Sequence, residues 1–133
     1  MAEVVINGRY QLHDTLGQGG MGVVYHATDR LTGQSVALKQ VHLPSAYPLF
    51  SSNFLSKTTA DLRVALAHEF QTLASLRHPH IIDVLDYGFD AEQQPYFTMS
   101  YLAEAQTLLV AGEKTAVVGK VRLLQQVLLA LAY

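Results

Sequence analysis

Short runs in which apolar and polar residues alternate fill the first third of this chain and predict β-strands. Over residues 10–16 apolar side chains alternate with polar ones except at Asp14, which is the period of a half-buried strand. Residues 23–25 and 35–41 contain branched and aromatic side chains that favour strands, and a turn at residues 29–33 separates them. These runs predict an antiparallel meander.

The middle of the chain changes to helical spacing. Apolar residues recur three or four positions apart between residues 62 and 76, and Thr58 or Thr59 provides an N-cap for this helix. His78-Pro79 predicts its end, because proline disfavours the α conformation in the residue before it. The preceding stretch, residues 43–57, has no period and predicts a loop.

Two more strands and a last helix complete the predicted elements. Residues 81–85 and 96–101 predict strands, joined by a turn that carries Gly88, Asp90 and Pro95. Residues 117–133 predict a long helix with an apolar stripe, formed by Val117, Val121, Leu124, Leu128 and Leu131. Because the chain changes from short strand-like runs with glycine turns to helical periodicity, the order of elements predicts an α+β fold rather than repeated βαβ units.

Composition and charge narrow the classes of function. The chain has 133 residues, of which 50% are hydrophobic, so it forms one globular domain or part of one. Its net charge of -2 provides no basic field for nucleic acid or anionic lipid, and the absence of cysteine excludes disulfides and thiolate chemistry. It contains neither a signal peptide nor about 20 uninterrupted apolar residues for a membrane span, so we expect a cytoplasmic protein.

Gly17, Gly19 and Gly22 form a G-x-G-x-x-G motif, and its context decides what it means. A dinucleotide-binding fold would continue into a helix here, but residues 23–25 favour a strand. A Walker A loop is also excluded, because no Gly-Lys-Ser or Gly-Lys-Thr follows the motif. A strand, a glycine turn and a second strand can fold over phosphates, because glycine lets backbone N–H groups approach the oxygens without a Cβ in the way.

Ala37, Lys39 and Glu69 are the next candidates. Ala37 and Lys39 share one face of a strand, which suits a flat base beside a phosphate, although a single strand lysine is more often an exposed edge residue. Glu69 lies on the apolar stripe of the predicted helix, where a carboxylate is costly unless a cation such as Lys39 meets it. A rotation of the helix would instead place Glu69 in solvent. His68-Glu69 begins a zinc-protease motif but has Thr72 where the second histidine belongs, so no metal site is predicted.

Together these motifs resemble the N-terminal lobe of a Ser/Thr protein kinase. The resemblance is carried, in order, by Arg9-Tyr10, residues 16–25, residues 36–39, Glu69, residues 78–81 and residues 96–102. The Gly-Gly-Met-Gly form is most similar to the eukaryotic-like kinases of bacteria. The resemblance implies a kinase-like α+β lobe over residues 10–102, with a five-stranded antiparallel sheet, one C helix and a hinge. Residues 1–9 would be an N-terminal extension, and residues 103–133 would begin a truncated C-terminal lobe with one helix.

The resemblance also implies an ATP site. Lys39, held by Glu69 of the C helix, would pair the phosphates, and Met99 falls at the gatekeeper position. Ser100 and Leu102 fall at the hinge, whose backbone would read the edge of the adenine. The residues expected to bind ATP are Leu16, Gly17, Gln18, Gly19, Gly20, Met21, Gly22, Val23, Val24, Ala37, Lys39, Met99, Ser100 and Leu102.

The sequence lacks the motifs that complete a kinase. His-Arg-Asp, a D-F-G after the hinge and Ala-Pro-Glu do not occur, and Asp86-Tyr87-Gly88 lies before the hinge, where it predicts a turn. We therefore expect an ATP-binding lobe that is inactive alone, with the Mg²⁺ ligands outside this chain and the last helix covered by a missing C-terminal lobe or a partner. The alternative is a non-catalytic nucleotide-binding or interaction module, a degenerate kinase lobe.

Overall fold

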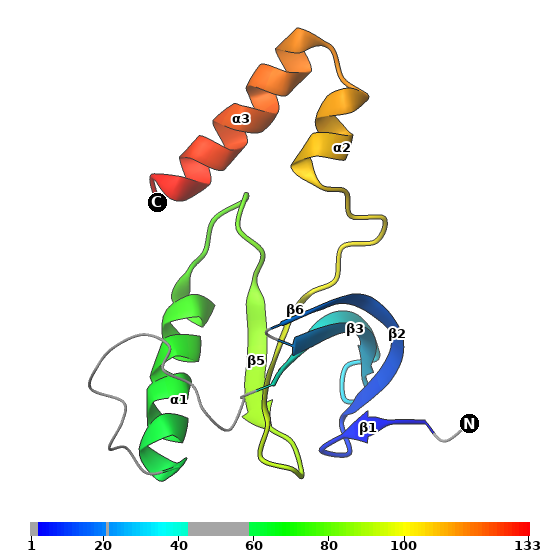
Figure 1. Ribbon diagram of the computed structural model, residues 1–133, viewed down its shortest axis with the longest axis vertical. Coiled ribbons are helices and arrows are strands. Elements are labelled where there is room, and N and C mark those ends of the chain that lie inside the picture. Colours follow the sequence, from blue (N-terminus) through cyan, green and yellow to red (C-terminus); the bar gives the residue numbers. More distant parts are fainter. Residues whose placement is uncertain (1–2, 21, 43–58) are drawn as a thin grey trace.

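The computed structural model describes residues 3–20, 22–42 and 59–133, and it places a curved sheet beside one long helix (Figure 1). The elements are β1 (Val5–Ile6), β2 (Tyr10–Gly19), β3 (Gly22–Asp29), β4 (Gln34–Val41), α1 (Thr59–Ser75), β5 (Val84–Phe89), β6 (Pro95–Ser100), α2 (Leu108–Glu113) and α3 (Val117–Leu131). All five pairs of neighbouring strands are antiparallel, and the order across the sheet is β1-β2-β3-β4-β6-β5. The α+β fold is confirmed.

The sheet of the described residues has six strands, not the five that were predicted, and the additional one lies in the expected N-terminal extension. β1 pairs with β2 across a tight turn in which Asn7 and Gly8 have φ of 51° and 68°, a left-handed conformation that these two residue types tolerate. Asn7 Nδ2 donates to the carbonyl of Phe89 at 2.8 Å. The pattern of alternation missed β1 because two residues are too few to show a period.

Downstream, two predictions of local structure were wrong. β5 begins at Val84, not at residue 81, and it includes Asp86-Tyr87-Gly88, which the sequence pattern assigns to a turn. The turn comes later, where the Asp90 carboxylate accepts from the backbone N–H groups of Glu92 and Gln94. The helix α2 was not predicted, since six residues are too few to define helical spacing. The predicted loop at residues 43–57 and the Thr58 cap lie outside the described residues.

The main hydrophobic core lies on one face of the sheet. It is formed by Ile6, Tyr10, Ala27, Val36, Leu38 and Tyr96, with Leu12 and Tyr25 packed against it. Partners in adjacent antiparallel strands share a face. Val24, Lys39 and Phe97 are such partners, one residue out of phase with the core set, so they lie on the opposite face. The part of this second face that β2, β3 and β4 form is available for a site.

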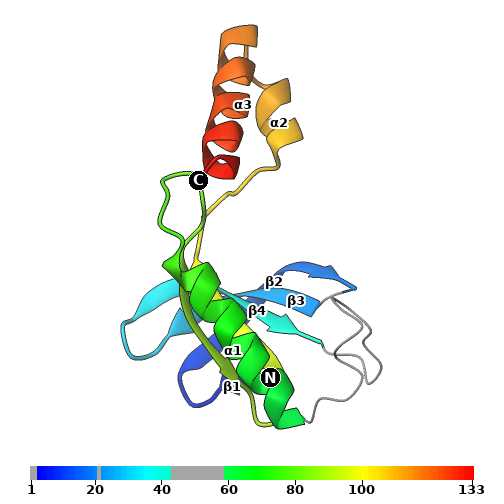
Figure 2. The ribbon, with the colours of Figure 1, turned by 90° about the vertical axis from the view of Figure 1, so that its left-hand side faces the viewer.

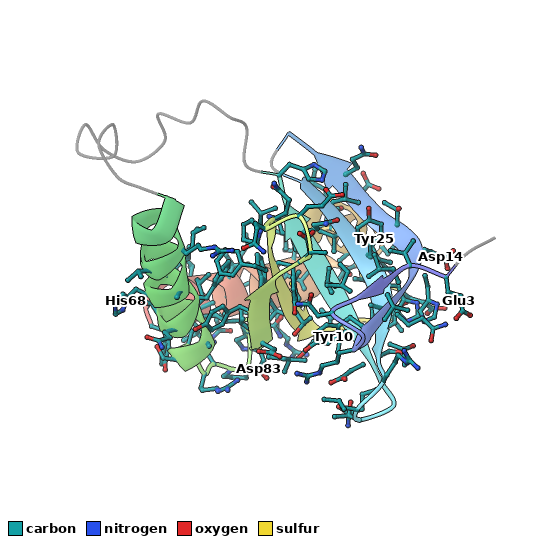
Figure 3. All side chains as sticks on the ribbon, turned by 90° about the horizontal axis from the view of Figure 1, so that it is seen from below. Glu3, Tyr10, Asp14, Tyr25, His68 and Asp83 are labelled. Atoms are coloured by element: carbon teal, nitrogen blue, oxygen red, sulfur yellow. The ribbon has the colours of Figure 1, made fainter. Side chains whose placement is uncertain are left out.

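α1 packs on the second face of the sheet through Phe70. The Phe70 side chain is buried, and its ring centroid lies 5.3 Å from that of Tyr87 and 5.4 Å from that of Phe97. Glu69 is exposed. Successive helical residues are about 100° apart, so a helix that turns Phe70 to the sheet cannot also turn Glu69 there. His68 points away from the sheet (Figure 3).

A charged cluster connects the β1–β2 turn to β3 and β5. Arg9 donates from Nε and Nη2 to the two carboxylate oxygens of Asp29, at 3.0 and 2.8 Å, and from Nη1 to Asp86 at 2.7 Å. Tyr10 donates its hydroxyl to the same Asp86 oxygen at 2.8 Å. The hydrogen bonds from Arg9 lower the pKa of Asp29 to about 2. The pKa of Tyr10 is raised, mainly by burial of its hydroxyl and also by the hydrogen bond that it donates to Asp86.

α2 and α3 form a helical pair that stands clear of the sheet (Figures 1 and 2). Neither helix has a buried residue. The exposed apolar side chains of α3 are Val117, Val118, Val121, Leu124, Val127, Leu128, Leu129 and Leu131. Within the described ranges, no helix combines the length and the apolar character that a bilayer crossing needs.

Candidate nucleotide-binding site

A hollow of about 250 Å³ opens between the Gly-rich hairpin and the middle of the sheet. Its lining residues are Gly17, Gln18, Gly19, Gly22, Val24 and Lys39. The strand register explains why they meet, because Gly17 pairs with Val24 across β2 and β3, and Val24 pairs with Lys39 across β3 and β4. All six belong to the set that the resemblance implies. Three strands therefore bring a glycine-rich rim and a cation to one place.

The hairpin glycines differ in what they do for the fold. Gly22 has a φ of 135°, and a Cβ there would collide with the carbonyl oxygen of Gln40 and lie 3.1 Å from the Cα of Val41. At Gly17, Gly19 and Gly20 an added Cβ would meet no atom within 4 Å. The fold therefore requires glycine at position 22. At the other three positions the fold leaves open space around the backbone, and two of them, Gly17 and Gly19, line the hollow.

Replacement of these glycines should separate the two roles. We expect Gly22→Ala to lower the free energy of unfolding by about 2 kcal/mol, because the backbone must move away from Gln40. Gly17→Ala, the matched control in the same hairpin, should change it by less than about 0.5 kcal/mol. Urea unfolding of both variants measures the difference. An equal loss of unfolding free energy in the two variants would show that the fold also requires glycine at position 17.

Lys39 provides the cationic group of the hollow. Its Nζ lies 5.8 Å from the ring centroid of Phe97, its partner on β6, within the range of a cation–π contact. In the part of the chain that the structure describes, no ion pair joins Lys39 to Glu69. The rotation of α1 that buries Phe70 leaves Glu69 exposed. For Glu69 to form the ion pair with Lys39 that the resemblance implies, α1 must rotate about its axis.

The predicted residues of the adenine end lie farther along the same face. Ala37 is buried and pairs with His26 on β3 and Met99 on β6, so the three side chains share the face of the hollow. Ser100 ends β6, where its backbone N–H donates to the carbonyl of Asp83 at 3.0 Å. Leu102 follows in the connection to α2 and is exposed. Ala37 and Met99 therefore extend the site away from the glycine loop.

Of the described residues predicted for the glycine loop, residues 16–24, three do not line the hollow. Leu16 is half exposed, and Gly20 is at the turn of the hairpin. Val23 is buried, and its register opposite Gln40 places its side chain on the core face. Val23 can therefore reach a ligand in the hollow only through its backbone. Met21 lies outside the described residues.

Sequence reasoning missed two aromatic residues beside this face. His26 lies two positions after Val24 on β3, and its ring stacks on that of Tyr101 at a centroid distance of 4.3 Å. The two-residue period of a strand was the available signal, since it places His26 on the same face as Val24. The contact with Tyr101 depends on the chain path after β6, which no local pattern predicts.

Size alone would select a different cavity. A hollow of about 570 Å³ lies between β1, the outer part of β2 to β4 and the β5–β6 turn, and none of the expected ATP-binding residues lines it. We assign the smaller hollow by its chemistry, since it combines Lys39 with open glycine backbone. No group of three or more His, Asp or Glu side chains in the described residues is arranged to hold a metal ion.

Comparison with known proteins gives three kinds of match. The family described as protein kinase domain matches residues 10–133. The chain is 38% identical over 99 residues to the DNA damage-responsive serine/threonine-protein kinase RqkA of Deinococcus radiodurans, covering 74% of this chain and 13% of that protein. It is 36% identical over 115 residues to a probable serine/threonine-protein kinase of Streptomyces coelicolor, covering 82% of this chain and 15% of that protein.

The fold also matches a solved structure. The crystal structure of the M. tuberculosis PknI kinase domain is similar with a TM-score of 0.67 and 23% sequence identity, covering 98% of this chain and 49% of that chain. This likeness shows the fold. The chain thus spans a small part of the two bacterial relatives and about half of the solved kinase domain.

Proposed function

Since this chain belongs to the protein kinase family, we propose that it forms the ATP-binding lobe of a Ser/Thr protein kinase. One observation carries the proposal, the convergence of Gly17, Gly19, Gly22 and Lys39 on a single hollow. Members of the family use ATP and Mg²⁺. A phosphate chain is a flexible polyanion, and an open glycine backbone beside an ammonium group is the chemistry that suits it.

The residues around the hollow fit ATP in a definite order. The glycine hairpin covers the phosphates, and Lys39 pairs with them. The small side chain of Ala37, between His26 and Met99 in the register, leaves room for a flat base on the same face. Beyond Met99, the backbone of Ser100 and Leu102 reads the edge of the adenine. Phosphate binding and base binding thus lie at opposite ends of one face of the sheet.

In this proposal, transfer of the γ-phosphate to protein Ser or Thr requires polypeptide beyond these 133 residues. The base that orients the substrate hydroxyl and the ligands of Mg²⁺ reside in motifs that the sequence does not contain. The chain corresponds to 49% of the PknI kinase domain, and the unburied apolar side chains of α3 suit packing against the remainder of such a domain.

The test is stabilisation by MgATP of the protein expressed with its complete natural coding sequence. A ligand that binds only the folded state at 100 times its Kd raises the free energy of unfolding by about 2.7 kcal/mol, so we expect a clear rise in Tm. Sodium sulfate at equal ionic strength is the control for nonspecific anion effects. No rise in Tm at millimolar MgATP would contradict the proposal. Binding without transfer of labelled γ-phosphate to Ser or Thr would instead favour the non-catalytic nucleotide-binding module.

A further inference from the structure

Three aromatic rings line up beside Ala37 and Met99, and they come from three separate parts of the chain. The imidazole of His26 on β3 lies almost parallel to the ring of Tyr101, with 4.3 Å between centroids and 18° between planes. On its other side, His13 of β2 lies 5.1 Å from His26 at an angle of 50°. Tyr101 is the first residue after β6. The row of rings therefore extends from β2 across β3 to the start of the connection.

Hydrogen bonds to neighbouring strands fix the two imidazoles. Nε2 of His26 and Oγ of Ser35 are hydrogen-bonded at 3.1 Å, which ties the ring to β4. Nε2 of His13 and Oγ1 of Thr28 are hydrogen-bonded at 2.7 Å, which ties that ring to β3. Thr28 and Ser35 are themselves register partners. His26 thus offers Tyr101 a flat surface whose orientation the sheet determines.

Tyr101 stands where the chain leaves the sheet. Ser100 is still fixed to the sheet by its N–H bond to Asp83, whereas residues 101–107 belong to no helix or strand. The stack with His26 therefore holds the first residue of the connection against β3. The backbone on either side of Tyr101, at Ser100 and Leu102, is the backbone that the proposed function assigns to the adenine edge.

We propose that His26 is a positioning residue for nucleotide binding, because its stack on Tyr101 holds the backbone of residues 100–102 beside Ala37 and Met99. The inference rests on the proposed function, since it concerns the adenine end of that same site. His26 acts through Tyr101. The near-parallel geometry uses the flat face of the ring, so an aromatic side chain without the imidazole nitrogens replaces it in this role.

The test separates the base from the phosphates by using three ligands. Affinities for ATP, adenosine and inorganic tripolyphosphate are measured by calorimetry on the protein with its complete natural coding sequence. We expect His26→Ala to lower the affinities for ATP and for adenosine each about fivefold, which is the effect of one lost ring contact. The affinity for tripolyphosphate should not change. His26→Phe should restore both affinities to within about twofold of the wild type. Lys39→Met should instead lower the affinities for ATP and tripolyphosphate and leave the affinity for adenosine unchanged.

Further variants test whether His26 acts through its contact with Tyr101. Tyr101→Ala should lower the affinities for ATP and adenosine as much as His26→Ala does. The double variant should bind both ligands as tightly as either single variant, because each substitution removes the same ring contact. His68→Ala, on the side of α1 that points away from the sheet, should leave all affinities unchanged (Figure 3). An equal loss for all three ligands, no loss in His26→Ala, or no recovery in His26→Phe would each overturn the inference. If the wild type binds neither ATP nor adenosine, the proposed function fails together with it, and that result is distinguishable from a variant without effect.

Discussion

Under the proposed function, replacement of Lys39 by methionine should lower the rate of phosphoryl transfer by the complete protein by about 100-fold or more. Removal of one group that stabilises charge in a preorganised site has effects of about this size. Methionine keeps an unbranched stem of similar length beside Phe97 but cannot pair with phosphates. Because Lys39 forms no ion pair among the described residues, its loss leaves none of their carboxylates without a partner. The variant should therefore keep the stability of the wild type within about 0.5 kcal/mol.

The matched control is Lys120→Met, which removes an exposed lysine of α3, the helix that stands clear of the sheet (Figure 1). Transfer of labelled γ-phosphate and urea unfolding are measured for both variants and the wild type. A Lys39→Met protein that keeps full activity would remove Lys39 from the site. A loss of activity accompanied by an equal loss in Lys120→Met would point to the net charge of the protein instead.

The main lines of the fold could be predicted from the sequence because they depend on periodicity. β2 to β4, α1 and α3 all extend over at least eight residues, long enough for alternation or helical spacing to be recognised. β1 and α2, with two and six residues, are too short for that. The Asp86-Tyr87-Gly88 error has another cause. A segment with a glycine and an aspartate is locally typical of a turn. Its place in β5 depends on contacts distant in sequence, namely the pairing with β6 and the hydrogen bonds that Asp86 accepts from Arg9 and Tyr10.

The site was predictable to the extent that strand registers determine it. The meeting of Gly17, Val24 and Lys39 follows from the hairpin and from the two-residue period. The position of Glu69 depends on the rotation of α1, which Phe70 determines by packing on the neighbouring rings of Tyr87 and Phe97. The spacing of apolar residues along a helix does not determine which of two neighbouring residues, such as Glu69 and Phe70, faces the sheet. The His26–Tyr101 stack also escaped prediction, because it joins positions 75 residues apart.

The second large effect is expected at Arg9. Arg9→Ala should lower the free energy of unfolding by about 3 kcal/mol near pH 7, since it leaves the Asp29 carboxylate without its cationic partner. The side chain of Asp29 is 6% exposed, so its carboxylate loses two charge-assisted hydrogen bonds in a site with little access to water. The control is Arg30→Ala, an exposed neighbour whose Nη1 reaches only the Gly8 carbonyl at 3.4 Å. It should change the stability by less than about 0.5 kcal/mol.

The loss in Arg9→Ala should itself depend on pH in a way that identifies Asp29 as its source. The hydrogen bonds from Arg9 hold the pKa of Asp29 at about 2, below the ordinary 3.8 that the unfolded chain retains. A lowered pKa in the folded state stabilises the protein fully above the unfolded value, and this contribution disappears as the pH falls through the folded value. The difference in unfolding free energy between wild type and Arg9→Ala should therefore be constant above about pH 5 and shrink toward pH 2. Urea unfolding along this pH series measures it. A difference that stays the same down to pH 2 would assign the stabilisation to packing of the arginine stem rather than to the paired charges.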